Sequence, residues 1–189
     1  MSVRPDPSRS SRNLGCARRD TGHSRVPAPP AGMIAWKADT RATILDLVAR
    51  LNASELIDLV LDPGTWESWD EPVDYSAQPE PYRTELAAAA ARAGTDESII
   101  TGRALVQGRP VAVVVNEFGF LAGSIGKVSA ERIVAAVRRA TSEGIPILAT
   151  TASGGTRMQE GTAAFVRMID ISRALMDHRT AGLPYLVYL

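Results

Sequence analysis

A Ser-Gly-Gly-Thr turn at residues 153–156 carries the groups best suited to chemistry in this sequence. It follows the apolar run at 145–150 and precedes apolar residues at helical spacing, which predicts a strand, a turn and a helix from about Arg157. The first N–H groups of a helix have no partner within it, and glycine lets a ligand approach the backbone. We therefore expect the main-chain N–H groups of Gly154 and Gly155 to bind an oxyanion such as a thioester enolate.

A glycine pair between a strand and a helix is also common as a tight connection without a catalytic role. On spacing alone, the two interpretations of the turn have equal weight. The residues that flank the turn favour the functional one.

Three motifs resemble one family. Residues 153–161 read SGGTRMQEG, residues 116–126 read NEFGFLAGSIG, and residues 181–185 read AGLPY. They resemble the SGGARMQEG signature, the NDF-x-F-x-GGS-x-G segment and the AGLPY strand of beta-type carboxyltransferase subunits of biotin-dependent acetyl- and acyl-CoA carboxylases. Their order and spacing indicate the N-terminal half of such a subunit.

The periodicity of the chain predicts an α/β protein. Strands are expected at 99–106 and 111–115 as a hairpin, at 145–150 and from Pro184, with helices at 82–93, 129–143 and 157–178. The order of these elements is that of an α/β spiral. The resemblance implies a partial ClpP/crotonase-like ββα spiral, preceded by N-terminal helices and truncated after Leu189.

The resemblance also implies residues that contact substrate. Gly123 and Ser124 would line the acyl-CoA side of the cleft, and Thr156 adds a hydroxyl beside the expected oxyanion site. Phe118 and Phe120 would face the acyl or pantetheine arm, with core packing of at least one of them as the alternative.

Arg157 has two interpretations. It would contact a CoA phosphate, or it would form a salt bridge with Glu160 at the start of the helix. Gln159 and Glu160 are expected to brace the turn rather than to act on substrate.

The activity that the resemblance implies is transfer of a carboxyl group from carboxybiotin to an acyl-CoA such as acetyl-CoA. The product would be malonyl-CoA, for fatty acid biosynthesis. Biotin would sit on a biotin carboxyl carrier protein, and an alpha-type subunit or the missing C-terminal half would complete an oligomer. The alternatives are a malonate decarboxylase beta-type subunit and a non-catalytic fragment or assembly subunit. The sequence shows no Ser-His-Asp or Cys-His arrangement, which agrees with catalysis by backbone groups.

The sequence departs from the family at three motif positions. Thr156 stands in place of alanine, Glu117 in place of aspartate, and Ala122 in place of the first glycine of GGS. These changes would alter acyl preference or mark a divergent subgroup.

Composition excludes several classes of protein. The 189 residues are 45% hydrophobic with zero formal net charge, so no nucleic-acid partner is indicated. No run approaches the roughly 18 apolar residues that span a membrane, and we expect a cytoplasmic protein. Cys16 is the single cysteine, and His23 and His178 lack partners at metal spacing, so we expect no metal and no zinc ribbon.

The chain divides into three parts by composition. Residues 1–32 hold six arginines, two aspartates and five prolines, which predicts a disordered extension, with Met33 as the expected true start. Residues 33–81 form a helical leader and irregular linker, including a helix from Thr40 and one capped by Ser54. Residues 82–189 form the N-terminal part of the carboxyltransferase domain.

Overall fold

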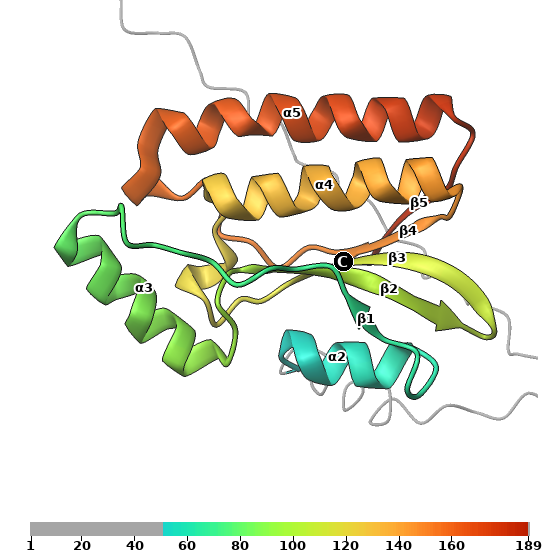
Figure 1. Cartoon of the computed structure of the whole chain (residues 1–189), viewed down its shortest axis with the longest axis horizontal. Coiled ribbons are helices and arrows are strands. Elements are labelled where there is room, and N and C mark those ends of the chain that lie inside the picture. Colours follow the sequence, from blue (N-terminus) through green and yellow to red (C-terminus); the bar gives the residue numbers. More distant parts are fainter. Residues whose placement is uncertain (1–50, 189) are drawn as a thin grey trace, which may run out of the picture. The chain divides into compact units, whose positions relative to one another are not determined.

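The computed structural model describes residues 51–188. The expected extension at 1–32, the start at Met33 and the helix expected from Thr40 lie outside these residues. The described part combines a five-stranded sheet with four α-helices (Figure 1). The helices are α2 (Ala53–Val60), α3 (Glu80–Ala93), α4 (Lys127–Glu143) and α5 (Gly161–Thr180), with short 3-10 turns η1 (Leu121–Gly123) and η2 (Met158–Glu160).

The sheet has the strand order β1-β2-β3-β4-β5. Strands β1 to β3 pair antiparallel, whereas β3, β4 and β5 run parallel. Parallel neighbours need a crossover, and α4 and α5 supply it. The mixed α/β architecture expected from the sequence is confirmed. The strands are β1 (Glu67–Ser68), β2 (Ile99–Val106), β3 (Arg109–Asn116), β4 (Ile147–Thr150) and β5 (Tyr185–Tyr188).

The central strand β3 is buried on both faces of the sheet. Ala112 and Val114 belong to the core beneath α4, whereas Val113 and Val115 belong to the core beneath α2. Successive residues of a strand point to opposite faces, which explains this division. Figure 1 shows α4 and α5 on one face of the sheet and α2 on the other. Thus α2 and β1, expected in a leader before the domain, pack against the same sheet.

Local signals set most element boundaries. Gly94 and Gly144 end α3 and α4 in the left-handed conformation that glycine adopts without strain, as expected. The cap of α2 differs from expectation. Asn52, not Ser54, accepts the N–H of Glu55, and the Glu55 carboxylate accepts the N–H of Asn52.

The expected hairpin between β2 and β3 is confirmed with a tight two-residue turn. Gln107 and Gly108 both have positive φ, at 51° and 75°, which is the pattern of a type I′ turn. The Asp62 carboxylate accepts both of their N–H groups, at 3.0 and 2.7 Å. Trp66 and Trp69 pack against opposite cores, so the packing role expected for both is confirmed.

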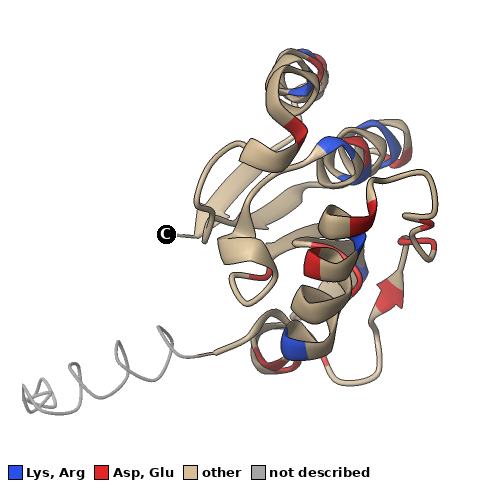
Figure 2. Ribbon diagram, turned by 90° about the vertical axis from the view of Figure 1, so that its left-hand side faces the viewer, with Lys and Arg blue, Asp and Glu red and all other residues tan. Residues whose placement is uncertain are grey.

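Strand β5 forms the outer edge of the sheet. All four of its side chains are exposed, although the segment YLVY is apolar and aromatic. Figure 2 shows the uncharged ribbon around this edge, whereas charged residues gather on the helices and on the loops beyond. This edge therefore presents apolar and aromatic side chains to the solvent.

Candidate functional site

The glycine turn follows β4 and is open to solvent. Residues 151–155 are all exposed, as an oxyanion site requires. The turn does not lead directly into a helix, however. Thr156 forms an isolated parallel bridge with Ile125, and α5 begins only at Gly161. The prediction that the helix starts near Arg157 is therefore wrong, because the bridge holds this backbone extended. Gly154 and Gly155 consequently lie outside the first turn of α5, where a helix dipole favours an anion.

The main-chain N–H groups of the turn have different partners. Gly154 donates to the Ala122 carbonyl at 2.8 Å, so the expectation of a free donor at Gly154 is wrong in this structure. Gly155 donates to the Ser153 hydroxyl at 3.1 Å, and that hydroxyl donates to the Gly123 carbonyl at 2.7 Å. A ligand oxygen can replace this exposed hydroxyl as the acceptor for Gly155.

Two further residues of the turn carry main-chain N–H groups that a ligand could use. Among the described residues, the main-chain N–H groups of Ala152 and Ser153 have no hydrogen-bond acceptor. Their position in an exposed loop makes them available to a bound anion. They lie before the glycine pair, and no sequence signal marked them.

The loop at 121–124 lies against the glycine turn. Leu121 and Ala122 have φ values of 45° and 54°, a region that residues other than glycine rarely adopt. Gly123, at φ 64°, also has no room for a side chain, because a Cβ would collide with the Ala152 carbonyl and lie 2.7 Å from the Asn116 Oδ1. The expected proximity of Gly123 to the turn is thus seen in the structure.

Asn116 secures this loop from the end of β3. Its Nδ2 donates to the carbonyls of Ser98 and Gly123, at 3.1 and 3.2 Å. Its main-chain N–H donates to the Thr150 hydroxyl at 3.1 Å. Asn116 therefore links the ends of β3 and β4 to the loop that faces the turn.

The two phenylalanines of the loop have different environments. Phe118 is 59% exposed and stays available for a ligand. Phe120 is fully buried in a cluster with Tyr82, Leu86 and Ala89, so its expected contact with substrate is corrected to a role in the core. Of the two phenylalanines, Phe120 therefore has the core-packing role that the sequence left as the alternative.

Arg157 is fully buried and does not face the solvent. Its Nη1 lies 3.0 Å from the Glu97 Oε2 and 3.2 Å from the Glu160 Oε1, and its Nη2 donates to the Glu97 Oε1. The expected salt bridge with Glu160 is confirmed, whereas contact with a CoA phosphate is excluded in this arrangement. Glu97, equally buried, had no signal in the sequence.

Charge pairing sets the protonation of this cluster. Burial alone would raise the pKa of Glu97, but the hydrogen bonds and charge of Arg157 outweigh burial and lower it. Burial alone would likewise lower the pKa of Arg157, and Glu97 raises it instead. Burial and the bond to Glu160 raise the pKa of Tyr82. The pair is therefore ionised, and both tyrosines beside it, Tyr75 and Tyr82, stay neutral.

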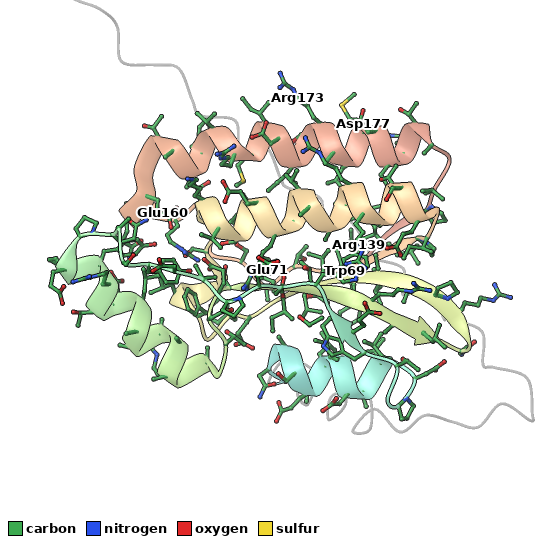
Figure 3. All side chains as sticks on the ribbon, viewed as in Figure 1. Trp69, Glu71, Arg139, Glu160, Arg173 and Asp177 are labelled. Carbon is green, nitrogen blue, oxygen red and sulfur yellow. The ribbon has the colours of Figure 1, made fainter. Side chains whose placement is uncertain are left out.

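Glu160 joins three elements, and Figure 3 shows it at the junction between α3 and α4. Its Oε1 accepts the Tyr82 hydroxyl at 2.7 Å, and its Oε2 accepts the N–H of Lys127, the first residue of α4, at 2.5 Å. Gln159 donates to Glu85 of α3 at 2.7 Å. Both residues therefore hold η2 against its neighbours α3 and α4, and that they brace the turn at 151–155 stays a prediction.

An apolar pocket of 260 Å³ opens beside the turn. It lies between the sheet and the pair of helices α4 and α5, and Thr151 and Ser153 lie in its wall. Its lining is mainly aliphatic, so it suits an apolar group that extends from the glycine turn. The aliphatic lining residues are Ile99, Val114, Ile125, Ile133, Val137, Ala149, Ile171 and Leu175.

The described residues contain no cluster of three or more His, Cys, Asp or Glu side chains that could hold a metal ion. None of the helices described is long and apolar enough to cross a membrane. His178 is buried, with Nδ1 2.9 Å from the Thr141 hydroxyl and Nε2 3.2 Å from the Pro184 carbonyl. Its role is structural, as expected.

Comparison with known proteins identifies one family. The family model described as carboxyl transferase domain matches residues 49–189. A probable biotin-dependent acyl-coenzyme A carboxylase beta3 subunit from Mycobacterium tuberculosis is 54% identical over 143 residues, which cover 75% of this chain and 29% of the relative. The chloroplastic carboxyl transferase subunit beta of acetyl-coenzyme A carboxylase from Coffea arabica is 39% identical over 137 residues, 69% of this chain and 28% of the relative. The chain spans less than a third of these relatives.

Solved structures show the same fold. The transcarboxylase 12S crystal structure matches with a TM-score of 0.58 and 22% identity, over 78% of this chain and 27% of that chain. A malonate decarboxylase hetero-dimer from Pseudomonas matches with a TM-score of 0.54 and 22% identity, over 72% of this chain and 51% of that chain. The crotonase-like fold expected for part of a longer domain is confirmed.

Proposed function

Because the chain belongs to the carboxyl transferase domain family, we propose that it forms the acyl-CoA half of a biotin-dependent carboxyltransferase. The observation that carries this proposal is the exposed turn at 151–155, in which main-chain N–H groups lie next to an apolar pocket. This arrangement suits a thioester, whose oxygen needs hydrogen-bond donors and whose acyl chain needs an apolar surface.

The turn would stabilise the negative oxygen of a thioester enolate. Loss of the α-proton from the acyl-CoA places charge on the thioester oxygen, and the α-carbon then forms the new bond to the carboxyl carbon. A fixed donor aimed at such an oxygen contributes about 3 kcal/mol to transition-state stabilisation. Gly155 is the donor we assign, with Ala152 and Ser153 as the other candidates in the turn. Gly154 contributes by letting the turn lie close to the facing loop, because a Cβ there would lie 3.1 Å from the Ala122 carbonyl oxygen.

Biotin on a separate carrier protein would supply the carboxyl group and take up the α-proton. The residues of this chain need then only hold the acyl-CoA and its enolate, which agrees with a turn that has donors but no side-chain base. The pocket beside the turn would hold the acyl chain. Acetyl-CoA as substrate, malonyl-CoA as product for fatty acid biosynthesis, and a cytoplasmic location are parts of the same proposal.

The active site would be completed by a partner. The relatives are more than three times as long as the matched segment, and the apolar edge at β5 is exposed. We infer that an alpha-type subunit, or a C-terminal half on a separate chain, covers the site in an oligomer and holds the biotin carrier.

A carboxyl-exchange assay with biotin and malonyl-CoA tests the proposal. The chain is assayed alone and with the part of the Mycobacterium tuberculosis beta3 subunit that it does not cover. We expect exchange only in the mixture. No exchange in a mixture that forms a stable complex would contradict the proposal.

The same assay separates the alternatives. A malonate decarboxylase beta-type subunit would act on a malonyl thioester of a carrier protein and not on malonyl-CoA. A non-catalytic assembly subunit would bind the partner without turnover of either thioester.

A further inference from the structure

We propose that Arg157 and Glu97 are a positioning pair that aligns the glycine turn at 151–155 with the loop at 121–126. This inference rests on the proposed function, since the pair would act on catalysis through the turn. Arg157 does not touch the substrate itself, because it is fully buried.

Arg157 contacts the loop through both its main chain and its side chain. Its N–H donates to the Ile125 carbonyl at 2.9 Å, and its Nη2 donates to the Ser124 carbonyl at 2.9 Å. In the opposite direction, Ile125 donates to the Gly155 carbonyl at 2.8 Å. Arg157, two residues after the turn, therefore sets the distance between the turn and the loop through two hydrogen bonds.

Glu97 anchors the guanidinium to the sheet. It lies two residues before β2, and its Oε1 and Oε2 accept the Ser98 N–H at 2.6 Å and the Tyr75 hydroxyl at 2.7 Å. Each oxygen of Glu97 thus accepts one hydrogen bond from Ser98 or Tyr75 and one from Arg157, which fixes the orientation of the carboxylate. A guanidinium matches such a carboxylate as a planar fork, which a lysine cannot reproduce.

Gly126 shows how closely the cluster is packed. Its φ of −94° is open to any residue, so the backbone does not require glycine here. A Cβ would nevertheless lie 2.7 Å from the Arg157 Nη1 and would collide with the Glu160 carboxylate. Gly126→Ala therefore disturbs the cluster without straining the backbone.

A stability role alone does not explain a buried pair of this kind. Removing two charges from water costs several kcal/mol per ion, and apolar replacements of both partners are often neutral for stability. Such apolar replacements lose the fixed geometry that the charged groups provide. A displacement of about 1 Å in a catalytic group can cost about 100-fold in rate, so such geometry matters for the turn.

Three variants test the pair. Glu97→Gln/Arg157→Met removes both charges of the pair, and Glu160, which loses its bond to Arg157, keeps the Tyr82 hydroxyl and the Lys127 N–H as donors. Gly126→Ala displaces the pair, and Arg157→Lys keeps the charge without the fork. Arg167→Met is the matched control, because Arg167 forms exposed ion pairs with Glu131 and Asp170. Each variant is first checked for a wild-type circular dichroism spectrum and a cooperative melt.

The first measurement is hydrogen exchange of the amides of Ile125, Gly154 and Arg157, whose acceptors lie across the gap between turn and loop. We expect exchange at least about tenfold faster in the first two variants, an intermediate effect in Arg157→Lys, and no change in Arg167→Met. Unchanged exchange in folded Gly126→Ala and in the double variant would overturn the proposal.

The second measurement is kcat and KM for malonyl-CoA in the carboxyl-exchange mixture. We expect kcat to fall at least about tenfold with KM changed less than about twofold, because transition-state donors are displaced while binding remains. Faster amide exchange with wild-type kcat would also overturn the positioning role. If the wild-type mixture shows no carboxyl exchange, the proposed function fails, and the amide exchange still decides whether the pair aligns the turn.

Discussion

Backbone strain is concentrated in the loop that faces the glycine turn. Leu121, Ala122 and Gly123 follow one another with positive φ, and only the last is a glycine. The Ala122 carbonyl accepts the Gly154 N–H, so the strained residue directly shapes the turn. Strain of this kind persists where the surrounding structure enforces it, and it is frequent at functional sites.

Replacing Ala122 with glycine should relieve part of this strain. An alanine in the left-handed region costs about 1 kcal/mol relative to glycine, and the greater freedom of glycine in the unfolded chain offsets some of the gain. We expect Ala122→Gly to raise the free energy of unfolding by up to about 1 kcal/mol, measured by urea denaturation. A loss of stability in this variant would show that the alanine methyl has a packing role.

The neighbouring position should respond in the opposite direction. A Cβ at Gly123 would collide with the Ala152 carbonyl in addition to the strain of its φ. Gly123→Ala should therefore destabilise the fold by more than about 1 kcal/mol in the same denaturation experiment. Equal stability of Gly123→Ala and wild type would mean that the loop moves freely away from the turn.

At the scale of elements, one buried side chain near the end of α5 links this helix to two of its neighbours. His178 joins α5 to Thr141 of α4 and to the Pro184 carbonyl just before β5. Earlier in α5, Arg173 points away from the other elements (Figure 3). The two positions allow a matched comparison on one helix.

His178→Leu should cost about 1 to 3 kcal/mol, because it removes the two hydrogen bonds of the buried ring, to the Thr141 hydroxyl and to the Pro184 carbonyl, while preserving most of the side-chain volume. Arg173→Ala should stay within about 0.5 kcal/mol of wild type. Thermal melts of the two variants measure the difference. A midpoint for His178→Leu equal to that of Arg173→Ala would show that α5 is held by apolar packing alone.

The sequence predicted those elements whose signals are local. Gly94 and Gly144 mark helix ends, and Gln107-Gly108 marks a hairpin, because each forms its structure with neighbours in the chain. The start of α5 was predicted too early, since a partner 31 residues away, Ile125, holds Thr156 extended. The residues from Met158 onward have helical spacing, but spacing does not reveal such a bridge.

The same limit applies to the candidate site across the whole molecule. Its motifs could be found in the sequence, whereas the acceptor for Gly154 and the partner for Arg157 lie in segments about 30 and 60 residues earlier, at Ala122 and Glu97. The burial of Phe120 likewise depends on α3. Tertiary contacts therefore decided which amide is paired and which side chain faces solvent.

At the scale of the whole molecule, the exposed edge at β5 and the match to less than a third of the relatives support the proposal that a partner completes the site. The turn at 151–155 would meet its partner across an open surface. Its main-chain donors are then the contribution of this chain to catalysis, and the most direct test obstructs one of them.

That test is the rate of carboxyl exchange by Gly155→Val in the mixture with the remainder of the beta3 subunit. Gly182→Val is the control, because Gly155 and Gly182 both have positive φ, 93° and 77°, and no atom within 4 Å of an added Cβ. We predict a loss of at least about 100-fold for Gly155→Val, because the valine strains the backbone at this φ and its side chain obstructs the approach to the Gly155 N–H, and less than about threefold for Gly182→Val. A folded Gly155→Val variant with the wild-type rate would contradict the assignment of the turn.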